Sequence, residues 1–206
     1  ASRRADYRFA RGVVYQGDTV VADFKGTRFD NEVLGLAAAA VVAALEAINI
    51  EPACASRAAQ QFKPLPHRMQ PVAELRGVHF VNDSKGTNLS AMAAALKMTA
   101  GRVRLIAGGL VKENDFGFIK VLLAEKAAGI YLIGQASDDM ASAWSDAVPC
   151  FKCGTLDVAV RKAWADAHPG ETVLLSPACA SFDQFRNFEE RGERFTVLVK
   201  KLAGEI

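Results

Sequence analysis

Residues 64–206 alternate short apolar runs with stretches of helical periodicity, and this alternation limits the possible folds more than any other feature of the chain. Four runs are predicted to be buried strands, at residues 78–81, 103–107, 130–133 and 172–175. Shorter strands are expected near 71–75 and 148–151, and helical patterns fill about 88–98, 115–127, 136–145, 155–167 and 185–202. Strands that alternate with helices in this way predict an α/β fold with a largely parallel sheet.

The first 62 residues have a different pattern. Residues 12–15 and 19–23 are apolar and flank Gln16-Gly17-Asp18, which predicts a hairpin. The Ala-, Leu- and Val-rich run 33–48 predicts a long helix buried on most sides, and 53–61 predicts a second, short helix. Pro64 and Pro66 exclude helix between them and stiffen the chain. We therefore expect two domains, 1–62 and 64–206, joined by a linker.

Composition excludes several classes of protein. The net charge of +2 in 206 residues implies no nucleic-acid or membrane-surface partner. No apolar run approaches the roughly 20 residues that span a bilayer. The start lacks both an initiator Met and an apolar signal region, so we expect a piece cut from a longer protein.

The four cysteines are too few for a disulfide scaffold in a chain of this size. Cys150 and Cys153 have C-x-x-C spacing, which leaves redox or zinc chemistry open. No second pair accompanies them, and the three histidines lack ligand spacing. Structural thiols in a reducing compartment are the favoured interpretation, and the cytoplasm fits best.

Three polar clusters follow predicted strands, where open α/β sheets bind ligands. In residues 82–88, Asp83 suits ribose hydroxyls or a metal site, Lys85 suits a phosphate, and Thr87 is a candidate N-cap. The alternative is a polar turn with a helix cap. In residues 108–116, paired glycines precede Lys112, a candidate for a carboxylate or phosphate.

The third cluster is residues 176–181, where Ser181 and Gln184 match a capping box and the free N–H groups suit an anion. An ordinary capped helix start is the alternative. No P-loop pattern occurs in the chain. Arg68 directly follows the linker, from which it can reach an interdomain cleft. For His67 we favour packing at the hinge over catalysis.

The string from Ser176 to Gly192 resembles the C-terminal signature of the Mur ligases, most closely the branch that adds D-glutamate. The segments 65–68, 82–88, 108–116 and 176–192 stand in the order and approximate spacing of that family. The resemblance implies that 64–206 is a Rossmann-like amino-acid-binding domain. It also implies that 1–62 is a small α/β remnant, the end of the central ATP-binding domain.

The resemblance also implies chemistry. ATP would phosphorylate the carboxylate of UDP-N-acetylmuramoyl-L-alanine, and the D-glutamate amine would attack the acyl phosphate in peptidoglycan precursor synthesis. It implies nucleotide contacts for Arg68, Asp83 and Lys85, D-glutamate contacts for Thr87, Lys112, Ser181, Phe182 and Phe188, and catalytic roles for Lys85 and Lys112. Mg2+ would be bound mostly by the absent part of the enzyme, with no metal ligand in this chain. A cytoplasmic monomer is expected.

Three departures from the family pattern leave alternatives open. Arg28-Phe29 replaces a His-Asn pair of the adenine site, Leu110-Val111 makes the surroundings of Lys112 more apolar, and Phe182 replaces a smaller aliphatic residue. One alternative is another Mur-type or folylpolyglutamate-type ligase. The other is a degenerate module that binds an amino acid without catalysis. A Rossmann oxidoreductase is disfavoured, because no G-x-G-x-x-G follows a predicted strand.

Overall fold

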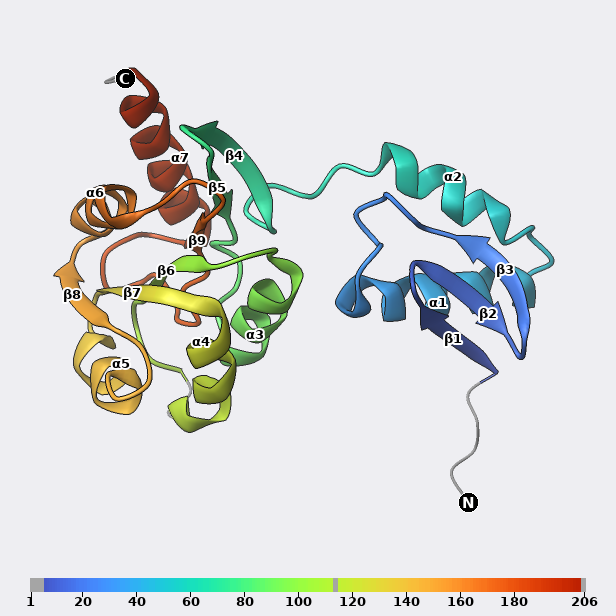
Figure 1. The fold of residues 1–206 in the computed structure, drawn as a ribbon, viewed down its shortest axis with the longest axis horizontal. Coiled ribbons are helices and arrows are strands. Elements are labelled where there is room, and N and C mark those ends of the chain that lie inside the picture. Colours follow the sequence, from blue (N-terminus) through green and yellow to red (C-terminus); the bar gives the residue numbers. More distant parts are fainter. Residues whose placement is uncertain (1–5, 113–114, 205–206) are drawn as a thin grey trace. The chain divides into compact units, whose positions relative to one another are not determined.

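The computed structural model describes residues 6–112 and 115–204, and it divides into two compact units (Figure 1). Unit 1 is Ala1–Lys63 and unit 2 is Pro64–Ile206. The division falls at the first of the two prolines that break the sequence pattern. Each unit has its own hydrophobic core.

Unit 1 is a three-stranded antiparallel sheet with two helices. Its strands are β1 (Tyr7–Ala10), β2 (Val13–Gln16) and β3 (Thr19–Asp23), in the order β1-β2-β3. The predicted hairpin is confirmed, since β2 pairs with β3 and Gly17 occupies the turn at φ 59°. The helices are α1 (Glu32–Ala47) and α2 (Ala53–Gln61). The prediction missed β1, because its short polar-apolar alternation resembles a solvated end.

Helix α1 begins at Glu32 because the side chain of Asn31 accepts a hydrogen bond from the Leu34 N–H at 2.9 Å. Only small side chains and one valine of α1 are buried, and Leu36 is 70% exposed. The prediction of a helix buried on most sides is therefore wrong within the described residues. An apolar composition shows that a helix can be buried on most sides. In unit 1, however, the short strands cover only one face of α1.

Unit 2 is built on a six-stranded sheet of order β4-β5-β9-β6-β7-β8. Its strands are β4 (Gln70–Leu75), β5 (Val78–Asn82), β6 (Val103–Gly108), β7 (Ala127–Ile133), β8 (Cys150–Gly154) and β9 (Thr172–Leu175). Only β4 is antiparallel to its neighbour, so the predicted largely parallel α/β sheet is confirmed. The last strand of the chain, β9, is fully buried between β5 and β6.

Helices cover both faces of this sheet (Figure 1). One face carries α3 (Leu89–Met98), the 3-10 helix η1 (Phe116–Ile119), α4 (Lys120–Lys126) and α5 (Ser137–Trp144). The other face carries α6 (Leu156–Asp166) and α7 (Phe188–Gly204). Alternate residues of β6 feed the two cores: Leu105 belongs to the first and Ile106 to the second.

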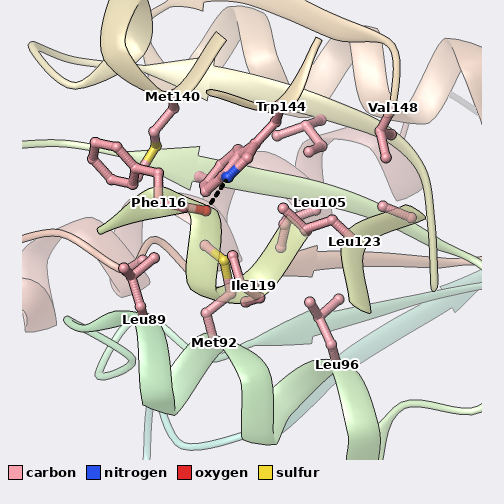
Figure 2. Close-up of a cluster of buried hydrophobic side chains, with 14 of the residues drawn as sticks. Leu89, Met92, Leu96, Leu105, Phe116, Ile119, Leu123, Met140, Trp144 and Val148 are labelled. Atoms are coloured by element: carbon pink, nitrogen blue, oxygen red, sulfur yellow. Dashed lines mark hydrogen bonds between the residues drawn. The ribbon is translucent and has the colours of Figure 1, made fainter. Parts of the chain in front are cut away.

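The first core is drawn in Figure 2, where side chains of α3, η1, α4 and α5 meet those of the sheet. Trp144 is fully buried, and its indole N–H donates to the carbonyl of Phe116 at 2.8 Å. Their rings pack edge to face with centroids 5.7 Å apart. This bond satisfies the only polar atom that Trp144 brings into the core.

Three predicted helix boundaries in unit 2 are wrong. The helix expected at 115–127 is η1 followed by α4, and β7 already begins at Ala127. The helix expected from 185 begins at Phe188, because Asn187 Oδ1 accepts from the Glu190 N–H at 2.8 Å. Asn88, rather than Thr87, caps α3, since its side chain accepts from the Ala91 N–H at 2.7 Å. Asn outranks Thr as an N-cap.

No helix within residues 6–112 and 115–204 is long and apolar enough to cross a bilayer.

Candidate functional site at the carboxyl edge of the sheet

Four loops meet where the parallel strands β5, β9, β6 and β7 end. The loop after β9 is bonded to the loops on both sides of it: Ala178 N–H donates to Gly86 O, and Gly108 N–H donates to Pro177 O, both at 2.9 Å. Beyond β6, Leu110 and Ala180 form an antiparallel bridge. Ala178 has a φ of +58°, which is strained for a residue with a Cβ. The convergence predicted from the strand pattern is present, and the loops hold one another in place.

Gly109 is required at this junction. Its φ is +132°, and a Cβ there would lie 2.3 Å from the carbonyl oxygen of Ala180. Its own carbonyl accepts from the Ala136 N–H of the loop after β7 at 2.9 Å. The paired glycines therefore let two loops approach closely, as their freedom of φ suggests.

Asp83 joins the start of unit 2 to the centre of the sheet. Its side chain is almost fully buried and accepts from the Ser176 hydroxyl at 2.8 Å and from the Met69 N–H at 3.1 Å. Both contacts order the loops around it, so the carboxylate has a structural task whichever ligand binds. Arg68, which precedes Met69 in the chain, is exposed.

A second connection is made by His67, Asn82 and α7. The His67 side chain is buried, and the Asn82 side-chain amide lies 3.1 Å from its Nδ1 and donates to Gly192 O at 2.9 Å. A Cβ on Gly192 would lie 2.2 Å from the same His67 nitrogen. His67 is thus packed tightly against α7, as the packing interpretation predicts. Asn82 is not among the predicted site residues.

Arg191 joins two of these loops, although it is not among the predicted site residues. It is fully buried, and its guanidinium donates to the Ser84 hydroxyl (3.0 Å) and carbonyl (2.9 Å) and twice to the Cys179 carbonyl (3.1 and 3.2 Å). Burial lowers the pKa of Arg191 to about 10. The signal was available: Arg191 lies three residues after Phe188 and four before Phe195, on the apolar face of α7.

Lys85 and Phe188, both predicted site residues, lie together. The Lys85 ammonium is 3.9 Å from the centroid of the Phe188 ring, and the Ser84 hydroxyl donates to the Phe188 carbonyl at 2.8 Å. The predicted site residues from β5 and from α7 are therefore neighbours, although they are about a hundred positions apart in the sequence.

Three of the remaining predicted residues lie close in the chain to the Leu110–Ala180 bridge, and Thr87 lies on the loop after β5. Ser181 follows the bridge and is buried, whereas Phe182 is 67% exposed. Lys112 lies two residues beyond Leu110 and is exposed, and Thr87 is half-buried. Because the bridge is antiparallel, Ser181 lies on the Gly109 side of it and Lys112 on the Ala178 side, so the bridge joins the two segments and separates these two residues.

The capping box predicted for Ser181 and Gln184 is wrong. The Ser181 carbonyl accepts from the N–H groups of Gln184 and Phe185, which forms a turn ahead of α7. The Asp183 carboxylate accepts from the Gln135 N–H at 3.1 Å and so ties this turn to the loop after β7. The positive end of α7 therefore lies seven residues beyond Ser181, at Phe188.

The C-x-x-C pair forms no redox or metal site. Cys150 packs in the first core and Cys153 in the second, on opposite faces of the sheet. Burial raises the pKa of Cys150 to about 11 and raises that of Cys153 as well. Within the described ranges, no three His, Cys, Asp or Glu side chains are grouped to hold a metal. The two thiols pack in separate cores, as the interpretation as structural thiols would predict.

Comparison with known proteins finds relatives that match most of the chain. The profile of the Mur ligase glutamate ligase domain matches residues 67–179. UDP-N-acetylmuramoylalanine–D-glutamate ligase of Acidobacterium capsulatum is 41% identical over 85% of this chain and 37% of its own length. The enzyme of the same name from Solibacter usitatus is 44% identical over 80% of this chain and 37% of its own length.

Among solved structures, the bifunctional folylpolyglutamate synthase/dihydrofolate synthase of Yersinia pestis, complexed with AMPPNP and Mn ion, aligns with a TM-score of 0.61. The alignment covers 98% of this chain and 46% of that one at 20% identity, so the likeness is one of fold. The chain spans a little over a third of the length of the curated relatives it matches.

Proposed function

The chain belongs to the Mur ligase family, and from this premise we propose that it is the C-terminal part of an ATP-dependent ligase that adds D-glutamate to UDP-N-acetylmuramoyl-L-alanine. One observation carries the proposal. The match to the glutamate ligase domain spans the loops after β5 and β6 and the first four residues of the loop after β9, which the fold brings together. In the proposed reaction the amine of D-glutamate attacks an acyl phosphate, and an amide, ADP and phosphate result.

We assign the acceptor site to the two segments joined by the Leu110–Ala180 bridge. D-Glutamate carries two carboxylates and needs two anion-binding elements. Lys112 supplies a formal positive charge on one segment, and Ser181 supplies a hydroxyl and an N–H on the other. Thr87 lies on the neighbouring β5 loop and completes the proposed polar rim. Exposed Phe182 and Leu110 give this rim an apolar edge beside the acceptor.

We assign the nucleotide side to the loop after β5 and to the start of unit 2. Lys85 and Arg68 are the cations proposed to meet phosphate oxygens, and Asp83 is the proposed ribose contact. Asp83 is held in place by Ser176 and Met69, so it would present a preorganised carboxylate. Among residues 6–112 and 115–204, no three His, Cys, Asp or Glu side chains are grouped as metal ligands. The chain also lacks a P-loop, so the proposal places magnesium and the phosphate cradle outside it.

A non-catalytic amino-acid-binding module is the second candidate, and Phe29 favours it. In place of the amide expected in an adenine site, Phe29 packs edge to face on Phe62, with centroids 5.1 Å apart, and also contacts Phe24. That aromatic cluster lines an apolar pocket within unit 1 of about 150 Å³. At this position an amide that could bond to the adenine base is thus replaced by a phenylalanine that packs against other aromatic rings.

ADP release by the full-length polypeptide distinguishes these candidates. If the protein is the proposed ligase, ADP release should depend on both D-glutamate and UDP-N-acetylmuramoyl-L-alanine. L-Glutamate, L-lysine or L-alanine should not replace D-glutamate. The 206-residue chain alone should release no ADP. Binding of D-glutamate by the full-length protein without any ADP release would establish the binding module instead.

Lys112→Ala tests the acceptor site in the same assay. Removing the charge should lower kcat/KM for D-glutamate at least about 30-fold, roughly 2 kcal/mol, because the bound carboxylate, which the proposal shields from water in the full-length enzyme, loses its charged partner. Lys200→Ala is the matched control: Lys200 is exposed on α7 and should leave kcat/KM unchanged. If both variants retain wild-type kcat/KM, Lys112 is a solvated surface residue and the assignment fails.

A further inference from the structure

The cation of Lys85 has an aromatic partner and no acidic one. Its Nζ lies 3.9 Å from the Phe188 ring centroid, and among residues 6–112 and 115–204 no carboxylate lies within 4.0 Å of it. A cation over an aromatic face is attracted by the negative charge of the ring's face. The contact therefore fixes a long side chain that would otherwise sample many rotamers.

The ring is itself held by the residues that hold Lys85. The Phe188 carbonyl accepts from the Ser84 hydroxyl at 2.8 Å, and Ser84 accepts from buried Arg191 at 3.0 Å. On the Lys85 side, the backbone N–H of Lys85 donates to the His67 carbonyl at 3.0 Å. The His67 ring meets the Phe188 ring edge to face, with centroids 6.1 Å apart. Phe188 and Lys85 are thus both held by the same set of contacts, which runs through Ser84 and His67.

We propose that the Phe188 ring is a positioning residue for Lys85: it holds the ammonium group at the carboxyl edge of the sheet, ready to meet an oxyanion. This role rests on the proposed function, and it is distinct from a contact between Phe188 and the amino acid. A cation–π contact leaves the ammonium charge unneutralised, so an arriving phosphate or carboxylate finds a cation that is in place and not already paired.

The contact can be measured in the 206-residue chain without any activity. In protein labelled with 13C-lysine, the Lys85 Hε signals, assigned by their loss in Lys85→Arg, should lie upfield of the other lysines because of the ring current. Phe188→Leu, which keeps an apolar side chain, should abolish the displacement, and Phe188→Tyr should retain it. Lys85 signals that coincide with those of the other lysines in the wild-type chain would overturn the proposal.

A double-mutant cycle in the full-length enzyme tests the consequence. Phe188→Leu should lower kcat/KM for ATP about tenfold, Phe188→Tyr should recover most of that loss, and Phe188→Leu should add nothing once Lys85 is already Ala. Additive losses would show that the ring acts independently of Lys85 and would overturn the positioning role. Absence of D-glutamate ligation in the wild-type enzyme would instead refute the proposed function, with the NMR result standing by itself.

Discussion

Replacing Arg191 by Met should destabilise unit 2 substantially while keeping the apolar stem of the side chain. The guanidinium makes four hydrogen bonds to three acceptors, all on fully buried Ser84 or on Cys179, which is 1% exposed. Each buried acceptor that loses its donor costs about 1–3 kcal/mol. Two acceptors lie on the loop after β5 and one on the loop after β9, so the variant also removes the tie between these loops.

A gain offsets part of that loss. The lowered pKa of Arg191 means that burial disfavours its charge, and the size of this penalty is about 3 kcal/mol. The three lost acceptor contacts together cost about 6 kcal/mol at the middle of their range, so the net destabilisation should be about 3 kcal/mol. Removing the charge alone would therefore stabilise the fold if the hydrogen bonds were unimportant.

Urea unfolding followed by tryptophan fluorescence measures this directly. The two tryptophans of the chain, Trp144 and Trp164, both lie in unit 2, so the signal reports that unit alone. Arg161→Met is the matched control, because Arg161 is exposed on α6 and should change the free energy of unfolding by less than about 0.5 kcal/mol. An Arg191→Met variant as stable as the wild type would refute the claim that Arg191 ties the two loops together.

Two further changes test the framework. Burial alone would raise the pKa of Glu171, but hydrogen bonds from Arg104 and from the His168 N–H lower this pKa below its ordinary value. The ion pair between Glu171 and Arg104 therefore stabilises the fold above about pH 4.3, and this stabilisation is lost as the pH falls through the lowered pKa. Glu171→Gln should therefore cost about 1–3 kcal/mol at pH 7 and progressively less in acid, and a cost independent of pH would contradict this account. Gly192→Ala should destabilise unit 2 by about 1–3 kcal/mol in urea unfolding, because its Cβ would meet the His67 ring, whereas Gly204→Ala meets nothing within 4 Å. Equal unfolding free energies for these two alanine variants would show that His67 is not tightly packed.

The sheet could be predicted because buried parallel strands are short continuous apolar runs. β9 was predicted with its observed bounds, since all four of its residues are buried and polar residues flank it. β7 was predicted too short, because Ala127, Ala128 and Gly129 have little strand preference and become a strand by pairing with β6. Local propensity could not reveal that pairing.

The candidate site could be predicted in outline for a geometric reason: parallel strands place the loops that follow them at one edge. The sequence pattern could not predict the hydrogen bonds that connect these loops to one another and to α7. Arg191 reaches Ser84 across 107 positions, and Asn82 reaches Gly192 across 110. Such contacts leave no periodic signal in a single sequence.

Binding of D-glutamate to the 206-residue chain, mapped residue by residue, tests the central claim most directly. In 15N-labelled protein the account predicts saturable shifts with an affinity of roughly millimolar strength, centred on the N–H groups of Gly109, Leu110, Ser181 and Phe182. L-Glutamate at the same concentration should produce no saturable shifts there. Shifts that are equal for both enantiomers, that lie away from the Leu110–Ala180 bridge, or that are absent altogether would contradict a D-glutamate site at this edge of the sheet.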